Sequence, residues 1–253
     1  MAFANARAPE IRRSVVSYLK GLARPYAPAI SLPWHGPSWA RALRLLRTQG
    51  VAPATVFDIG VAYGTFPLYR SFPEAFYHLI DPAAESRACM EKLARRLNCQ
   101  IHTLALGDRD GEAALEVRED FQESTLFQEE GPRRARRVDR VAMRRFDSLF
   151  GAIKRPLLVK IDVQGAELMV LEGMTGRLAE VDALIVETST IATIKNGPEV
   201  AAIVRFMEDR GFALVDILGL RRRPLDGATA QLDLMFAPQS GALRRDRRWA
   251  ASA

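Results

Sequence analysis

Short apolar runs recur along the chain and alternate with longer segments in which apolar and polar positions follow a helical period. The apolar runs predict strands at residues 54–59, 76–81, 100–105, 156–162, 182–188, 212–218 and 230–237. Helical spacing in the gaps predicts helices at 84–97, 165–172 and 198–210. Strands that alternate with helices indicate an α/β fold, in which a mostly parallel sheet is covered on both faces.

The residues before the first of these strands follow a different pattern. Helical spacing recurs at 11–22 and again at 39–48, with a proline-rich segment between them and Gly50 closing the second helix. We therefore divide the chain into an N-terminal helical extension at 1–50, a core domain at 51–239 and a basic tail at 240–253.

Residues 110–145 also interrupt the alternation of strands and helices. Residues 112–117 and 138–143 have the composition of two extra strands, which enclose a polar stretch and a cluster of arginines. We interpret this segment as an insertion on the substrate side of the sheet. A hairpin with no role in binding is an equally good interpretation.

A glycine-containing turn follows the first core strand. Asp58 ends the strand, and Gly60 and Gly64 permit a tight turn that brings the backbone close to a ligand. The second strand ends in Asp81, about 20 residues beyond the first glycine, where an acidic residue is placed to bind ribose hydroxyls. Ligands of parallel sheets bind at the carboxyl ends of the strands, a rule that adds Leu106 and Asp108 to the same edge.

The residues of this turn discriminate between nucleoside cofactors. A dinucleotide needs closer glycines, because its pyrophosphate sits on a helix N-terminus. The wider spacing argues against a nicotinamide-dependent oxidoreductase, and the Asp58 carboxylate would repel a pyrophosphate. A carboxylate instead suits S-adenosylmethionine (SAM), which carries a ribose, a cationic amino acid end and no phosphate. Asp58, Gly60, Gly64, Asp81, Leu106 and Asp108 are therefore our candidate cofactor-binding residues.

A second group of charged residues surrounds a later strand. Period-two alternation puts Lys160 and Asp162 on one face of that strand, and Asp162 falls at its carboxyl end. Both charges are costly to bury without partners. Glu167 lies in the first turn of the next helix, where the dipole favours an anion. A buried ion pair with a helix-start glutamate explains part of this set, but it explains Asp162 poorly.

With these blocks in place, the chain resembles the FkbM-type SAM-dependent methyltransferases over roughly residues 52–238. The blocks that carry the resemblance are 58–64, 81–82, 124–126, 146–149, 160–167 and 184–187. The resemblance implies a seven-stranded Rossmann-like sheet with an antiparallel last strand at 232–236. It also implies O-methyl transfer to a hydroxyl of a sugar, glycan or natural product. The chain departs from the family pattern at 61–62, at Asp81 and at Gln164, where the family has Ala-Asn, Glu and Glu.

Methyl transfer from a sulfonium is an in-line displacement that also requires removal of the hydroxyl proton. Asp162 is our first candidate for contacting that hydroxyl and Glu187 the second, with Lys160 orienting Asp162. Ser124, Thr125 and Glu167 are candidate substrate-binding residues. Asp162 and Glu187 are also able to share a divalent cation, but two carboxylates are too few to establish a metal site.

Composition narrows the remaining classes of function. The net charge of +6 comes from clustered arginines, which favour an alternative function as a nucleic-acid methyltransferase. Few aromatic residues accompany the arginines, so that alternative ranks lower. A non-catalytic binding protein with the same fold is a further alternative. Cys89 and Cys99 match no metal or disulfide spacing, and no apolar run is long enough to span a membrane. We expect a cytoplasmic enzyme, and the sequence leaves the oligomeric state and a membrane-surface contact open.

Overall fold

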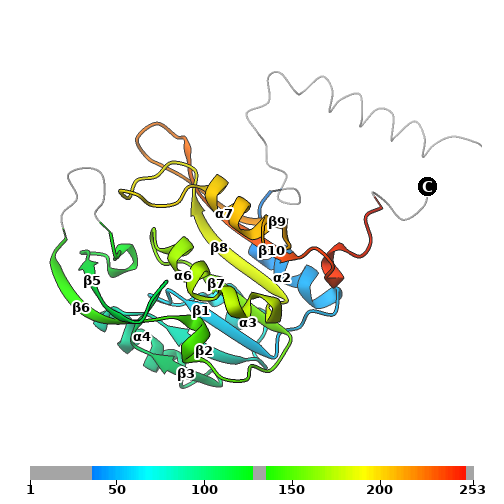
Figure 1. Ribbon diagram of the computed structural model, residues 1–253, viewed down its shortest axis with the longest axis horizontal. Coiled ribbons are helices and arrows are strands. Elements are labelled where there is room, and N and C mark those ends of the chain that lie inside the picture. The colour runs from blue at the N-terminus through cyan, green and yellow to red at the C-terminus, as the bar shows by residue number, and fades with distance from the viewer. Residues whose placement is uncertain (1–35, 128–134, 249–253) are drawn as a thin grey trace, which may run out of the picture. The chain divides into compact units, whose positions relative to one another are not determined.

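The computed structural model describes residues 36–127 and 135–248 (Figure 1). A seven-stranded sheet has the order β3-β2-β1-β7-β8-β10-β9. The strands are β1 (Thr55–Ile59), β2 (Phe76–Ile80), β3 (Cys99–His102), β7 (Leu157–Ile161), β8 (Ala183–Ser189), β9 (Phe212–Arg222) and β10 (Thr229–Pro238). In this sheet β10 is antiparallel to both of its neighbours, β8 and β9, and all the other strand pairs are parallel. The predicted fold class and the predicted antiparallel last strand are thus confirmed.

The middle of the sheet is apolar because both of its faces are covered. Every residue of β1 and β7 is buried, as expected for central parallel strands. On one face the strands pack against α6 (Glu167–Gly173) and α7 (Val200–Glu208), and on the other against α2 (Trp39–Thr48), α3 (Phe66–Ser71) and α4 (Ala84–Leu93). The chain leaves β1 toward β2 and later returns on the other side at β7, so the crevice for a ligand opens between these strands.

Helix α2 is the predicted helix at 39–48 in the N-terminal extension, and it is part of this core. Ser38 caps its first turn by accepting a hydrogen bond from the Arg41 amide at 3.4 Å. Leu43 and Leu46 are buried in the cluster that includes Leu68 of α3. The helix predicted at 11–22 lies outside the described residues.

A second, three-stranded sheet has the order β4-β6-β5 and contains β4 (Ala105–Leu106), β5 (Gly111–Val117) and β6 (Arg137–Arg144). The predicted strands at 112–117 and 138–143 are confirmed as β5 and β6. The single strand predicted at 100–105 is wrong, because β3 ends at His102 and the chain then changes sheets. Ala105 pairs with Met143 of β6, which removes it from the main sheet.

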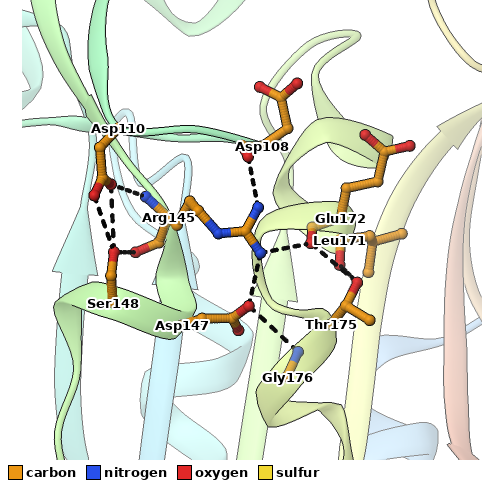
Figure 2. Close-up of polar contacts among 9 residues, drawn as sticks. All are labelled: Asp108, Asp110, Arg145, Asp147, Ser148, Leu171, Glu172, Thr175 and Gly176. Carbon is orange, nitrogen blue, oxygen red and sulfur yellow. Dashed lines mark hydrogen bonds and ion pairs between the residues drawn. The ribbon is translucent and has the colours of Figure 1, made fainter.

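Arg145 joins three segments of the chain (Figure 2). Its guanidinium donates to the carbonyl of Asp108 at 2.6 Å, to the Asp147 carboxylate at 2.8 Å and to the carbonyl of Glu172 at 3.3 Å. These contacts tie the turn after β4 to α5 (Phe146–Leu149) and to the end of α6. The turn after β4 is thereby fixed against the main sheet. Among the described residues, no helix is both long and apolar enough to cross a membrane.

Candidate cofactor and active site

A cavity of about 830 Å³, partly open to solvent, lies at the carboxyl ends of β1, β2 and β7. Its walls come from the glycine-containing turn, from the ends of β2 and β7, and from the second sheet with its insertion. The lining includes Gly60, Ala62, Gly64, Asp81, Leu106, Phe121, Ser124, Thr125, Lys160, Asp162 and Gln164.

The glycine turn has a backbone that side chains would obstruct. Gly60 has φ +79°, and a Cβ there would lie 1.7 Å from the carbonyl oxygen of Asp162. Ala62 also adopts positive φ, at +44°, although it carries a side chain. The turn can pass so close to the end of β7 only because Gly60 has no Cβ.

Asp81 is held at the cavity wall by backbone amides. Its carboxylate accepts from the N–H of Ala62 at 2.8 Å and from the N–H of Ala83 at 2.9 Å. Burial raises the pKa of Asp81, although the two amides act in the opposite direction. A carboxylate has about four acceptor sites, so it has capacity for two hydroxyl groups beyond these amides. The contact of Asp81 with the ribose of a cofactor stays a prediction.

Asp58 lies behind the glycine turn, and it is fully buried. Its carboxylate pairs with Lys160 Nζ at 3.1 Å and accepts from Thr65 Oγ1 at 3.1 Å and from the Tyr69 hydroxyl. The structure therefore corrects the expected direct contact between Asp58 and a cofactor ammonium group. The carboxylate is enclosed by its own partners, and its influence reaches the cavity through Lys160.

Lys160 links this buried carboxylate to the cavity. Its Nζ donates to the carbonyl oxygen of Gly60 at 2.6 Å and lies 3.6 Å from Asp162 Oδ2. Burial by itself lowers the pKa of Lys160, but the carboxylates of Asp58 and Asp162 outweigh burial and raise it. Lys160 is therefore charged, and it holds both the glycine turn and Asp162.

Asp162 and Glu187 are brought together at the ends of neighbouring strands β7 and β8. The Nε2 of Gln164 donates to Asp162 Oδ1 at 3.0 Å and to Glu187 Oε2 at 2.9 Å. Gln231 adds a second donor to Glu187 at 3.1 Å. Burial, followed by the charge of Asp162, raises the pKa of Glu187, so the two acids share a proton at neutral pH.

Glu167 has a different position from the one expected of a substrate-binding residue. Its Oε1 accepts from the N–H of Gly165 at 2.8 Å, and the side chain is buried. It lies beside a smaller pocket of about 240 Å³ that also contacts Glu187 and Thr188. Burial raises the pKa of Glu167 to about 7. The contacts assign it to the loop before α6, whose Gly165 it holds.

The insertion contributes one wall of the cavity. Thr125 Oγ1 donates to the carbonyl oxygen of Gln164 at 2.6 Å, and Ser124 Oγ accepts from the N–H of Arg118 at 3.3 Å. The ring of Phe121 lies 4.3 Å from that of Tyr63 in the glycine turn. Ser124 and Thr125 therefore reach the cavity, as expected of the predicted substrate-side residues.

Leu106 and Asp108 separate, although they are neighbours in sequence. Leu106 is buried and lines the cavity. The Asp108 side chain lies outside the lining and pairs with Arg109 at 3.2 Å, while its carbonyl joins the Arg145 cluster (Figure 2). The prediction that Asp108 faces the cofactor is therefore corrected, because the chain turns away from the cavity after β4.

Sequence reasoning missed several residues of the site. Thr65 and Tyr69 fix Asp58, and Gln231 contacts Glu187. Gln164 lies in the block at 160–167, where the sequence shows that the family's glutamate is replaced but not what the amide contacts. A search for amide and hydroxyl side chains next to the motif acids would have found Thr65 and Gln164. In the part of the chain that the structure describes, no three His, Cys, Asp or Glu side chains are arranged to hold a metal ion.

Comparison with known proteins gives one family match. The family profile described as "Methyltransferase FkbM domain" matches residues 58–214. "Methyltransferase 1" of Beauveria bassiana is 26% identical over 183 residues, which cover 63% of this chain and 72% of that protein.

Two solved structures of methyltransferases are also similar to the chain. The 1,6-didemethyltoxoflavin-N1-methyltransferase of Burkholderia thailandensis is 13% identical with a TM-score of 0.42, over 94% of this chain and 93% of that chain. The magnesium protoporphyrin IX methyltransferase of Synechocystis PCC 6803 is 12% identical with a TM-score of 0.44, over 93% and 86%.

Proposed function

Because the chain belongs to the FkbM methyltransferase family, whose members take their methyl group from SAM, we propose that it methylates a hydroxyl group of a sugar, a glycan or a related natural product. The proposal concerns the acceptor and the atom that is methylated. The class of acceptor is supported by the likeness to the family, and the hydroxyl as the methylated group is supported by the residues at the carboxyl end of β7.

The cavity residues fit SAM. Asp81 has spare acceptor capacity for the ribose hydroxyls, and the turn at Gly60 lets the backbone approach the ligand. Leu106 and Phe121 supply apolar wall for an adenine ring. When bound, SAM supplies an electrophilic methyl group on a sulfonium. The chain's own residues must then align the acceptor and remove its proton.

The observation that carries the proposal is the position of Asp162. It lines the cavity, and its side chain is 26% exposed, while Lys160 and Gln164 fix its two oxygens. A carboxylate so held can accept the proton of a hydroxyl that attacks along the cavity wall. Glu187 lines the smaller pocket rather than this cavity, and the amide of Gln164 joins it to Asp162.

The arginine cluster gives little support to the alternative of a nucleic-acid substrate. Arg137 pairs with Glu85 at 2.8 Å and with Asp139 at 2.9 Å. Arg145 contacts Asp147 and two carbonyl groups. Side chains that already meet acids and carbonyls lose these contacts when they bind phosphate, which reduces the gain from counterion release.

A transfer assay with matched variants tests the proposal. The full chain is incubated with methyl-labelled SAM and a panel of neutral sugars, oligosaccharides and glycosylated polyketides, and calorimetry measures SAM binding. We expect methylation of a hydroxyl acceptor, and a loss of about 10²–10⁴-fold in kcat in Asp162→Asn, with SAM still bound. The exposed Asp226→Asn is the control for a carboxylate change elsewhere.

Two results would reject the proposal. If the wild-type chain binds no SAM, the cofactor site fails. If Asp162→Asn methylates the acceptor as fast as the wild type, the assignment of O-methyl transfer to Asp162 fails.

A further inference from the structure

Gln164 is the side chain through which the insertion meets the two acids of the site. We propose that Gln164 is a positioning residue that connects the insertion to the acid pair. When the insertion is packed against Gln164, it fixes the distance between Asp162 and Glu187 and determines which of the two holds a proton. This inference rests on the proposed function, since it assigns the pair to the acceptor side of the cavity.

The backbone of Gln164 is held in an uncommon conformation. Its φ of +50° lies in the left-handed region, which residues other than glycine and asparagine seldom adopt. The next residue, Gly165, also has positive φ, at +94°. Such a conformation persists when surrounding contacts impose it, and it occurs often at functional sites.

Thr125 supplies the contact on the insertion side. Its hydroxyl donates to the carbonyl oxygen of Gln164 at 2.6 Å, across 39 residues of sequence. Thr125 is itself well fixed, because it is buried and exchanges backbone hydrogen bonds with Glu116 at 2.8 and 3.1 Å. The position of the Gln164 backbone therefore depends on the position of the insertion.

The amide of Gln164 supplies the contacts on the other side. One N–H group donates to the carboxyl group of Asp162 at 3.0 Å, and the other donates to the carboxyl group of Glu187 at 2.9 Å. In this orientation the amide donates to both carboxyl groups, whereas an amide oxygen in the same place could accept only from a protonated Glu187 and would face the oxygen of Asp162. The neutral amide of this chain offers two donors to the acid pair, which the glutamate of the family pattern at this position would not.

The contacts give Gln164 a measurable effect on Glu187. An N–H donor favours the ionised form of a carboxyl group, while a neighbouring negative charge disfavours it. In Gln164→Glu both changes act together, so Glu187 should keep its proton to higher pH. In Thr125→Val the carbonyl oxygen of Gln164 loses its donor, so the side-chain amide of Gln164 is less well fixed. Glu187 should again keep its proton to higher pH, but by a smaller amount than in Gln164→Glu.

Infrared titration of the full chain tests this inference without cofactor or acceptor. The carbonyl band of protonated Glu187 is taken from the difference between each protein and its Glu187→Gln derivative, and its midpoint is followed with pH. We expect Gln164→Glu to raise the midpoint by at least one pH unit and Thr125→Val by a smaller, resolved amount. Gln100→Glu, the same change at an exposed site, should leave it unmoved.

The outcomes separate cleanly. If the midpoint does not move in Gln164→Glu, the inference is overturned. If it moves in Gln164→Glu but not in Thr125→Val, the insertion is not linked to the acid pair, and the inference is overturned as well. Thermal melting shows whether each variant is folded, and Thr125→Val decides the question if Gln164→Glu does not fold. Because no methyl transfer is measured, failure here is distinct from failure of the proposed function.

Discussion

Replacement of Lys160 by methionine should destabilise the protein strongly, because the lysine is the only cation paired with Asp58 among the described residues. Asp58 is fully buried, and the Lys160 side chain is 5% exposed at 3.1 Å from it. Removal of one partner from a buried ion pair costs about 3–5 kcal/mol, because the other charge is left uncompensated. For a domain of this size, that loss lowers Tm by roughly 6–20 °C.

The assay is urea and thermal unfolding of Lys160→Met, Asp58→Asn and the double variant, with the exposed Lys92→Met as the control. The double variant removes both charges, so it should recover about 0.5–3 kcal/mol relative to the sum of the single changes. A loss below about 1 kcal/mol in Lys160→Met would refute the reasoning. So would a double variant whose loss equals that sum.

Three further predictions follow from the site. Asp81→Asn should weaken SAM binding by roughly 10–150-fold in calorimetry, since a charged acceptor is lost, and an unchanged Kd would remove Asp81 from the cofactor site. The pKa of Glu187 is raised to about 9, so the folded chain keeps a proton that the unfolded chain loses, and the stability of the wild type should fall as the pH rises from about 5 to 9. If Tm falls as steeply with pH in Glu187→Gln, this prediction is contradicted. Arg145→Ala should cost about 1–2 kcal/mol in urea unfolding, whereas the exposed Arg95→Ala should cost less than about 0.5 kcal/mol, and equal losses would show that the cluster in Figure 2 adds nothing.

The elements of the main sheet could be predicted because their signals are local. Residues 157–161 are apolar except for Lys160, and β7 is buried at every position. The strand predicted at 100–105 failed for the opposite reason. Whether Ala105 continues β3 or starts a new strand depends on Met143, a partner 38 residues away that no local pattern reveals.

The candidate site could be predicted in part. Gly60, Asp81 and Asp162 line the cavity because the carboxyl ends of parallel strands meet at one edge of the sheet. Asp58 lies one residue before the end of such a strand, yet Lys160, Thr65 and Tyr69 enclose it. An acidic residue at a strand end is therefore placed by the fold, but its neighbours decide whether it faces the ligand.

The sequence alone determined the order of strands and helices, the glycine turn and the acids that follow the strands, since each depends on residues close together in the chain. Only the tertiary structure decided which of those acids reach the cavity and what holds them there. The contacts responsible join Lys160 to Gly60 across 100 residues, Thr125 to Gln164 across 39 and Gln164 to Glu187 across 23. Hydrogen-bond geometry at such separations is fixed by packing, which no local pattern encodes.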